Sequence, residues 1–222
     1  MDNSKIGHHI YRKFDQELED IQNQVLTLGR LVEEQIDLAM DAYISGDFTL
    51  AEKSIKSINQ VYALKKSLDD NCIQILVLRQ PAAFDLRFLI TVIKIIHELE
   101  LIGGLAEGIA KMAIQLSKGE GNEITDLSES VKSVLHVALT AFARINVNDI
   151  AVMNGLDKNI NRAYTHFSLQ LTSQMMEEPQ NITRILEILR IARALECIGD
   201  HAYHICEELI YMVNGERERL ID

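Results

Sequence analysis

The sequence contains few of the residues that interrupt helices or favour strands. It has no Trp, only 2 Pro and 11 Gly among 222 residues, and 5% aromatic residues. Because proline breaks helices and aromatic residues are enriched in strands, this composition favours long helices. Hydrophobic residues at 47% and charged residues at 25% are typical of a folded globular protein rather than of a disordered chain. The length allows one large domain or two small ones.

Cysteine is scarce and follows no ligand pattern. The three thiols belong to Cys72, Cys197 and Cys206, an odd number without the close pairs that structural zinc sites use. Neither a disulfide framework nor a thiolate metal site is therefore indicated. We expect buried free thiols.

Positive charge is also scarce, which limits the partners that the chain can bind. The 22 Lys and Arg are outnumbered by 33 Asp and Glu, giving a net charge of -11 and a pI near 5.1. Because nucleic-acid affinity comes largely from basic side chains at phosphates, no nucleic-acid partner is expected. The same charge opposes adhesion to an anionic membrane surface.

Long apolar runs and a secretory signal are absent from the sequence as well. No uncharged apolar run approaches the ~20 residues that span a bilayer, so we expect no direct membrane insertion. The opening residues, MDNSK, lack the basic region and apolar run of a signal peptide. A cytoplasmic protein is therefore expected.

Six segments carry apolar residues at three- and four-residue steps, the pattern of amphipathic helices. Gln35 interrupts the apolar stripe of the first segment. Turns are predicted at residues 46–47, Pro81 and Pro179, and the glycine-containing stretch 118–122 is the expected boundary between two halves. The predicted helices span residues 8–43, 49–78, 82–117, 126–144, 147–176 and 181–214.

The two halves of the sequence resemble each other. Residues 99–103 (LELIG) line up with residues 195–199 (LECIG), and Pro81 and Pro179 keep nearly the same spacing. We interpret this as an internal repeat of about 100 residues. Short turns make consecutive helices antiparallel, so each repeat is predicted to be an up-down-up three-helix bundle.

The predicted fold class is therefore all-α, with two tandem, pseudo-repeated three-helix bundles. The predicted domains are residues 1–120 and residues 121–222. The alternative is one six-helix bundle without a pseudo-twofold axis, which the spacing alone does not exclude.

The strongest candidate site lies in the last predicted helix. Glu196, Asp200 and His204 are four residues apart and Glu207 follows, so on a helix they share one face. Neighbouring carboxylates repel unless a cation lies between them, and a divalent ion bound by oxygens is a suitable cation. The simpler interpretation is a solvated acidic face. Gly199 costs about 1 kcal/mol in mid-helix, which suggests that another group approaches the backbone closely there.

The first repeat lacks the same pair of carboxylates. Its matching positions are Glu100 and Gly104. The middle helix of the second repeat offers Asp157, whereas the corresponding residues of the first repeat, 58–62, include no acid. Any metal site is therefore expected in the second bundle only.

Four segments, taken together, resemble the PhoU family. They are residues 9–21 (HIYRKFDQELEDI), 79–87 (RQPAAFDLR), 100–104 (ELIGG) and 196–200 (ECIGD), in the order of that family and covering nearly the whole chain. The resemblance implies paired three-helix bundles, a homodimer, and a function as a phosphate-transport accessory protein. It further implies a negative regulator of uptake and of the phosphate-starvation response, which contacts the transporter ATPase subunit and a phosphate-sensing histidine kinase.

The resemblance also implies a metal site. The family motif Glu/Asp-x-x-x-Asp binds divalent or iron ions in some members, and it is intact at Glu196 and Asp200. Asp157 matches the family's acid on the neighbouring helix, and Asn161 stands where a second acid is usual. We therefore expect Asp157, Glu196 and Asp200 to bind a divalent or iron ion of unspecified identity.

The first repeat departs from the family pattern at Gly104, Ile58 and Tyr62, which argues against a second metal cluster. A divergent PhoU-like metal-binding protein with other partners is therefore an alternative.

Two other functions, a metalloenzyme and a structural spacer, are alternatives to a regulator that binds other proteins. A carboxylate-bridged metalloenzyme would need a Glu-x-x-His pair in a core register, and a coiled-coil spacer would need a narrow apolar seam repeating every ~3.5 residues. The sequence shows neither pattern, nor a phosphate-binding glycine loop or a nucleophile elbow. We therefore expect a regulator that is not an enzyme.

Overall fold

The computed structural model describes residues 4–116, 122–148, 150 and 156–216, with the side chains of 12–116, 124–148, 150 and 159–216. All its long elements are helices. They are α1 (Ser4–Ser45), α2 (Phe48–Arg79), α3 (Ala83–Leu116), α4 (Asn122–Arg144), α5 (Leu156–Glu177) and α6 (Ile182–Asn214), with a 3-10 turn, η2 (Pro179–Asn181), before α6.

The two breaks predicted in the first half are confirmed, and local chemistry explains each. At the start of α2, the Asp47 side chain accepts a hydrogen bond from the Thr49 backbone N–H at 2.7 Å, which caps the helix. At its end, Gln80 adopts a left-handed conformation with φ of 47°, immediately before Pro81. Proline cannot donate the next helical hydrogen bond, so α3 starts afresh.

The prediction for the fifth helix is wrong at its start. A helix from residue 147 was expected, but α5 begins at Leu156. Ile145 has φ of 49°, and the Asn146 side chain accepts a hydrogen bond from the Asn148 N–H at 3.0 Å. An Asn side chain bonded to the backbone two residues on forms a turn that competes with helix formation.

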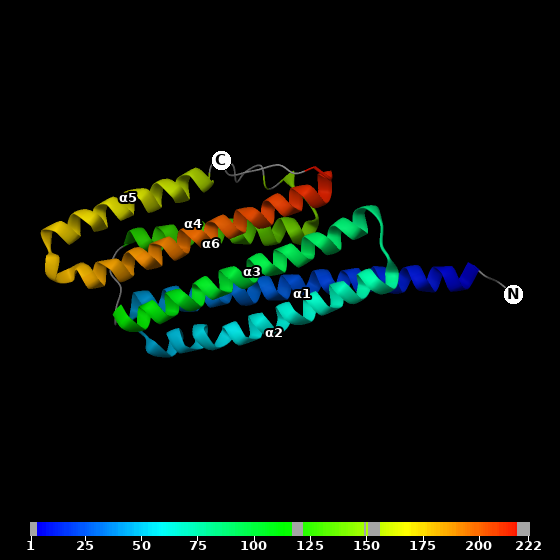
Figure 1. Cartoon of the computed structure of the whole chain (residues 1–222), viewed down its shortest axis with the longest axis horizontal. Helices are drawn as coiled ribbons and strands as arrows, with labels where there is room; N and C mark the ends of the chain where they lie inside the picture. The colour runs from blue at the N-terminus through cyan, green and yellow to red at the C-terminus, as the bar shows by residue number, and fades with distance from the viewer. Residues whose placement is uncertain (1–3, 117–121, 149, 151–155, 217–222) are drawn as a thin grey trace.

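The helices form two antiparallel three-helix bundles that lie side by side. The first bundle contains α1, α2 and α3, and the second contains α4, α5 and α6. The bundles meet where α3 packs on α6 and α1 on α4, while α2 and α5 lie at opposite outer edges (Figure 1). The predicted fold class is confirmed. The predicted domain boundary between residues 120 and 121 lies outside the described residues and stays a prediction.

The hydrophobic core continues across the junction between the bundles. The rings of Phe88 in α3 and Phe142 in α4 stack with centroids 6.2 Å apart. Gly29 in α1 lies so close to α4 that an added Cβ would come within 2.5 Å of Leu139 Cδ2. The junction is therefore closely packed. Within the described part of the chain, no helix combines the length and the apolar character needed to cross a bilayer.

Candidate functional site

Helix α6 carries the predicted site, but the structure divides the predicted face into two groups. Four-residue steps drift by about 40° around a helix, so Glu196 and His204 diverge over two steps. The ligand atoms of Glu196, Cys197 and Asp200 lie within 4.8 Å of one another. His204 instead joins His201 and Glu98, a residue of α3. His204, which was expected on the same helix face as Glu196 and Asp200, therefore belongs to a different close group.

Glu196 is buried, and a cation of its own helix compensates its charge. The Arg193 guanidinium donates a hydrogen bond to Glu196 Oε2. The same guanidinium lies 5.8 Å from the centroid of the Tyr164 ring in α5, a cation-π geometry. The Arg193 side chain is 54% exposed, whereas that of Glu196 is 10% exposed, so the pair joins a solvent-facing cation to a buried carboxylate.

Asp200 is half-buried beside Glu196. Burial, followed by repulsion from the Glu196 carboxylate, raises the pKa of Asp200 above its ordinary value, despite the opposing charge of Arg193. A divalent cation would remove this repulsion. The two carboxylates and the neighbouring thiol are a donor set that fits such an ion, which would compete with Arg193 for Glu196.

The predicted ligand Asp157 stays a prediction. Asp157 belongs to the first turn of α5, but its side chain lies outside the described residues. Asn161, one turn later, is half-buried on the same helix. The structure therefore brings together two of the three predicted ligands, Glu196 and Asp200.

The cysteines differ from one another in burial. All three are free thiols, and Cys72 and Cys206 are buried as expected. Burial raises the pKa of each of these two thiols to about 12. Cys197 is only half-buried, and its Sγ lies 3.6 Å from Glu196 Oε2. Burial, the largest effect, raises the pKa of Cys197 even though Arg193 opposes it. The expectation of a buried thiol is therefore wrong for Cys197.

The close approach expected at Gly199 occurs instead at its counterpart in the first repeat, Gly103. An added Cβ at Gly199 would make ordinary contacts, the nearest with Ile160 Cδ1 at 3.5 Å. At Gly103 it would come within 3.2 Å of both Gln35 Oε1 and Ile58 Cδ1. Close packing therefore requires a glycine at position 103 in the first bundle more than at position 199, beside the candidate metal site.

In the first repeat, a lysine lies beside the carboxylate that corresponds to Glu196. Lys65 Nζ lies 3.6 Å from Glu100 Oε2 and also pairs with Asp69 at 2.5 Å. The hydrogen bond with Asp69 is the main cause that raises the pKa of Lys65. Lys65 thus supplies a cation beside Glu100, and among the described residues no neighbouring atom lies within 4 Å of the position that a Cβ would take at Gly104. The expectation of a metal site in the second bundle only stays a prediction.

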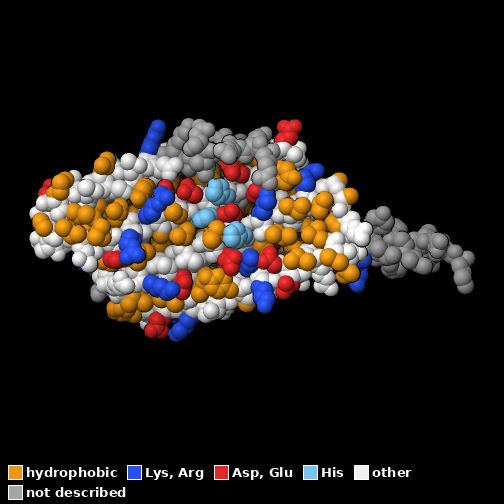
Figure 2. Space-filling view, viewed as in Figure 1, with side chains coloured by type: hydrophobic (Ala, Val, Ile, Leu, Met, Phe, Trp, Pro, Cys, Tyr) orange, Lys and Arg blue, Asp and Glu red, His pale blue; other side chains and the backbone are white. Residues whose placement is uncertain are grey.

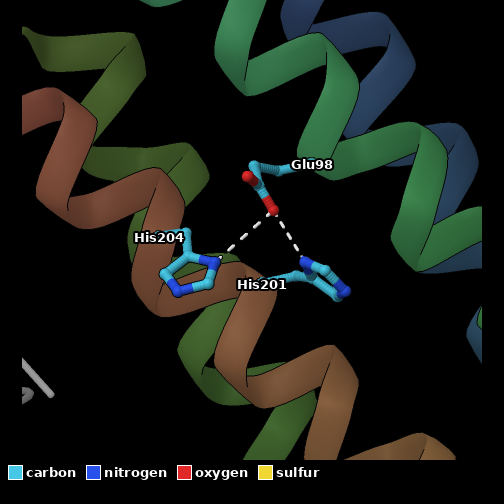
Figure 3. A group of neighbouring side chains, drawn as sticks. All are labelled: Glu98, His201 and His204. Atoms are coloured by element: carbon cyan, nitrogen blue, oxygen red, sulfur yellow. Dashed lines mark hydrogen bonds and ion pairs between the residues drawn. The ribbon is translucent and has the colours of Figure 1, made fainter.

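Glu98, His201 and His204 form a second group of possible ligands, which the sequence alone did not reveal. Histidine and acidic side chains gather near the middle of one face of the molecule (Figure 2). Both imidazole rings are turned toward the Glu98 carboxylate (Figure 3). The spacing of His201 and His204, three residues apart in a helix, was the available signal, but their partner lies about 100 residues away in the sequence.

The comparison with known protein families gives one match for each of the two bundles. A family model described as the PhoU domain matches the chain twice, over residues 25–113 and 124–209. The chain belongs to the PhoU family. Each match covers one three-helix bundle, so the internal repeat is a repeat of the PhoU domain.

Curated PhoU proteins are similar over nearly the whole chain. The phosphate-specific transport system accessory protein PhoU homolog of Pseudomonas aeruginosa is 38% identical over 221 residues, covering 97% of this chain and 91% of that protein. The phosphate-specific transport system accessory protein PhoU of Escherichia coli (strain K12) is 34% identical over 220 residues, with coverage of 97% and 91%.

Solved PhoU structures share the arrangement of the helices. The crystal structure of PhoU from Pseudomonas aeruginosa matches with a TM-score of 0.88 and 38% identity, covering 91% of this chain and 100% of that one. The phosphate transport system regulatory protein PhoU from Streptococcus pneumoniae matches with a TM-score of 0.86 and 28% identity, covering 94% and 99%.

Proposed function

We propose that this chain is a cytoplasmic accessory and signalling protein of a phosphate transport system, and that it lowers high-affinity phosphate uptake and the phosphate-starvation response. The observation that carries the proposal is the similarity, over 97% of the chain, to a phosphate-specific transport system accessory protein of the PhoU family. Both repeats of the PhoU domain are present, so the comparison extends to the whole architecture.

The proposed mode of action is contact with other proteins rather than catalysis. The partners are the ATPase subunit of the transporter and a phosphate-sensing histidine kinase, and the chain itself forms a homodimer. Large apolar side chains exposed near the end of α2, namely Ile73, Val77 and Leu78, support a function that depends on protein contacts, since such groups mark contact surfaces.

The proposed metal ligands are Asp157, Glu196 and Asp200. Glu196 and Asp200 supply the carboxylates, and Arg193 moves aside when a divalent or iron ion binds. Such an ion would supply positive charge between two acids that otherwise repel each other, and it would stiffen one partner-facing surface of the second bundle.

The proposed function is tested by deleting the gene in the native host and restoring it with variants. At high phosphate, deletion is expected to raise phosphate uptake and the activity of a phosphate-starvation promoter, and the wild-type gene is expected to restore both. The double variant E196Q/D200N removes the carboxylate charges with little change in shape, and it is expected to restore repression only in part.

The control is Glu52→Gln, which removes one carboxylate charge from an exposed side chain paired with Lys56 on α2. This variant is expected to restore full repression. Uptake and promoter activity that stay unchanged on deletion would contradict the proposed function. Full repression by E196Q/D200N would contradict only the contribution of the metal.

A further inference from the structure

Glu98 and two histidines meet where the two bundles join. Glu98 lies in α3 of the first bundle, and His201 and His204 lie one turn apart in α6 of the second. The Glu98 Oε2 atom is 2.7 Å from His201 Nδ1 and 3.7 Å from His204 Nδ1 (Figure 3). One carboxylate oxygen and two imidazole nitrogens therefore converge from two helices that belong to different repeats.

The spacing of these atoms suits a transition-metal ion. A tetrahedral zinc ion with bonds of about 2.0–2.1 Å holds its ligand atoms about 3.3 Å apart. The two distances from Glu98 Oε2, 2.7 and 3.7 Å, lie on either side of that value. Small rotations of the two imidazole rings would thus bring the nitrogen atoms into place. Nitrogen and carboxylate donors together suit zinc better than calcium or magnesium, which prefer oxygen alone.

Among the described residues, the carboxylate of Glu98 has imidazole groups rather than a lysine or arginine as its close partners. Burial, the largest single effect, raises the pKa of Glu98, but the hydrogen bond with His201 and the interactions with His201, His204 and His97 together lower it. Lys94 precedes Glu98 by one helical turn, but its ammonium group binds Glu208 at 2.8 Å. Glu100 and Glu196, in contrast, each have a Lys or Arg partner. The Glu98 side chain is only 18% exposed, so its carboxylate is largely removed from solvent and faces imidazole nitrogens.

The site is open on one side. The His204 side chain is 47% exposed, whereas His201 is 23% exposed. Three protein ligands and an open side leave the fourth tetrahedral position to water or to a group of a partner protein.

We propose that Glu98, His201 and His204 form a binding site for a zinc-like divalent ion that joins the two bundles. This site is separate from Glu196 and Asp200, because it uses other side chains and includes a ligand from the first bundle. Bound zinc would hold α3 against α6. It would therefore oppose any movement of one bundle relative to the other.

The test uses the full-length protein with E196Q/D200N as background, so that ions at the other carboxylates do not contribute. After treatment with EDTA, titration calorimetry with Zn²⁺ is expected to show one site. Co²⁺ is expected to give the visible absorption bands of a tetrahedral ion. Adding His204→Gln, an exposed position whose change leaves the core intact, should weaken Zn²⁺ binding by about tenfold or more.

The chain provides its own control in a second Glu–His pair between the bundles. His136 Nδ1 of α4 lies 3.2 Å from Glu33 Oε1 of α1, with a single histidine. His136→Gln in the same background should leave Zn²⁺ affinity and the Co²⁺ spectrum unchanged. Zn²⁺ should also raise the melting temperature of the background protein but not of the His204→Gln protein. Absence of Zn²⁺ binding in the background, or equal affinity with and without His204, would overturn the proposal.

Discussion

The side-chain amide of Gln35 donates a hydrogen bond to the main-chain carbonyl of Gly103 at 3.1 Å, inside the core of the first bundle. The same amide donates to the main-chain carbonyl of Ser54 at 3.1 Å, and the Ser54 hydroxyl donates to the main-chain carbonyl of Gln35 at 3.0 Å. Gln35 and Ser54 are fully buried. Three helices, α1, α2 and α3, are therefore held in register by polar groups within an otherwise apolar core.

Replacing Gln35 by Ala is expected to destabilise the protein by about 2 to 4 kcal/mol, because it removes two buried hydrogen bonds and leaves a cavity. Urea unfolding followed by circular dichroism measures the change. Gln60→Ala, at an exposed position of α2, is the control and is expected to change stability little. Equal stabilities of the two variants would contradict a structural contribution from Gln35.

The glycines of the two repeats are expected to respond differently to Ala. Gly199→Ala should stabilise the protein by up to about 1 kcal/mol, because Ala favours the helix and the new methyl group makes ordinary contacts. Gly103→Ala should stabilise less or destabilise, since its methyl group would press on Gln35 and Ile58. Thermal melting of both variants measures the difference. A lower melting temperature for Gly199→Ala than for Gly103→Ala would contradict this packing.

Asp200→Asn is expected to have opposite effects with and without metal. The folded-state pKa of Asp200 is raised by burial and by Glu196, so its ionised form lowers stability at neutral pH. In chelator at pH 7 the variant should melt higher, by up to about 4 °C. This gain should shrink as the pH falls through the raised pKa, because protonation removes the same cost in the wild type. With divalent ion present, the wild type should gain more stability than Asp200→Asn, which keeps only the group of Glu98, His201 and His204. A variant that melts lower than the wild type in chelator would disagree.

The ion pair between Glu17 of α1 and Arg79 of α2 is expected to make the stability of the protein depend on pH. Arg79 donates two hydrogen bonds to Glu17, at 2.7 and 2.9 Å, which lower the pKa of Glu17. Because the pKa of Glu17 is lowered in the folded state, its ionised form stabilises the protein at pH values above the ordinary pKa of 4.5. This stabilisation is lost as the pH falls through the lower, folded-state pKa. Glu17→Gln should therefore melt below the wild type at pH 7, with the gap closing toward pH 3. A gap that does not change with pH would contradict this contribution.

Much of the fold could be predicted because its signals are local. Apolar spacing identified six helices, and the predicted turn at residues 46–47 and Pro81 placed the breaks of the first half correctly. The start of α5 was missed because hydrogen bonding by the Asn146 side chain overrides the apolar pattern.

The candidate site was harder to predict because it depends on how separate helices align. Glu196 and Asp200 lie in one helix, so their spacing showed that they are neighbours. The partners Glu98 and His201 lie in different repeats, and apolar periodicity does not fix the register between helices. Gln35 illustrates the same limit. The sequence shows a polar residue within the apolar stripe of the first helix, but only the assembled bundle shows that this residue is buried.

We propose above all that the chain acts by contact with the ATPase subunit of a phosphate transporter and with a phosphate-sensing histidine kinase. Affinity capture of the tagged full-length protein from native-host lysate, grown at high and at low phosphate, tests it most directly. We expect mass spectrometry to identify the transporter ATPase subunit and a sensor histidine kinase, with retention that changes with phosphate supply. Retention of neither protein under either condition would contradict the proposed function.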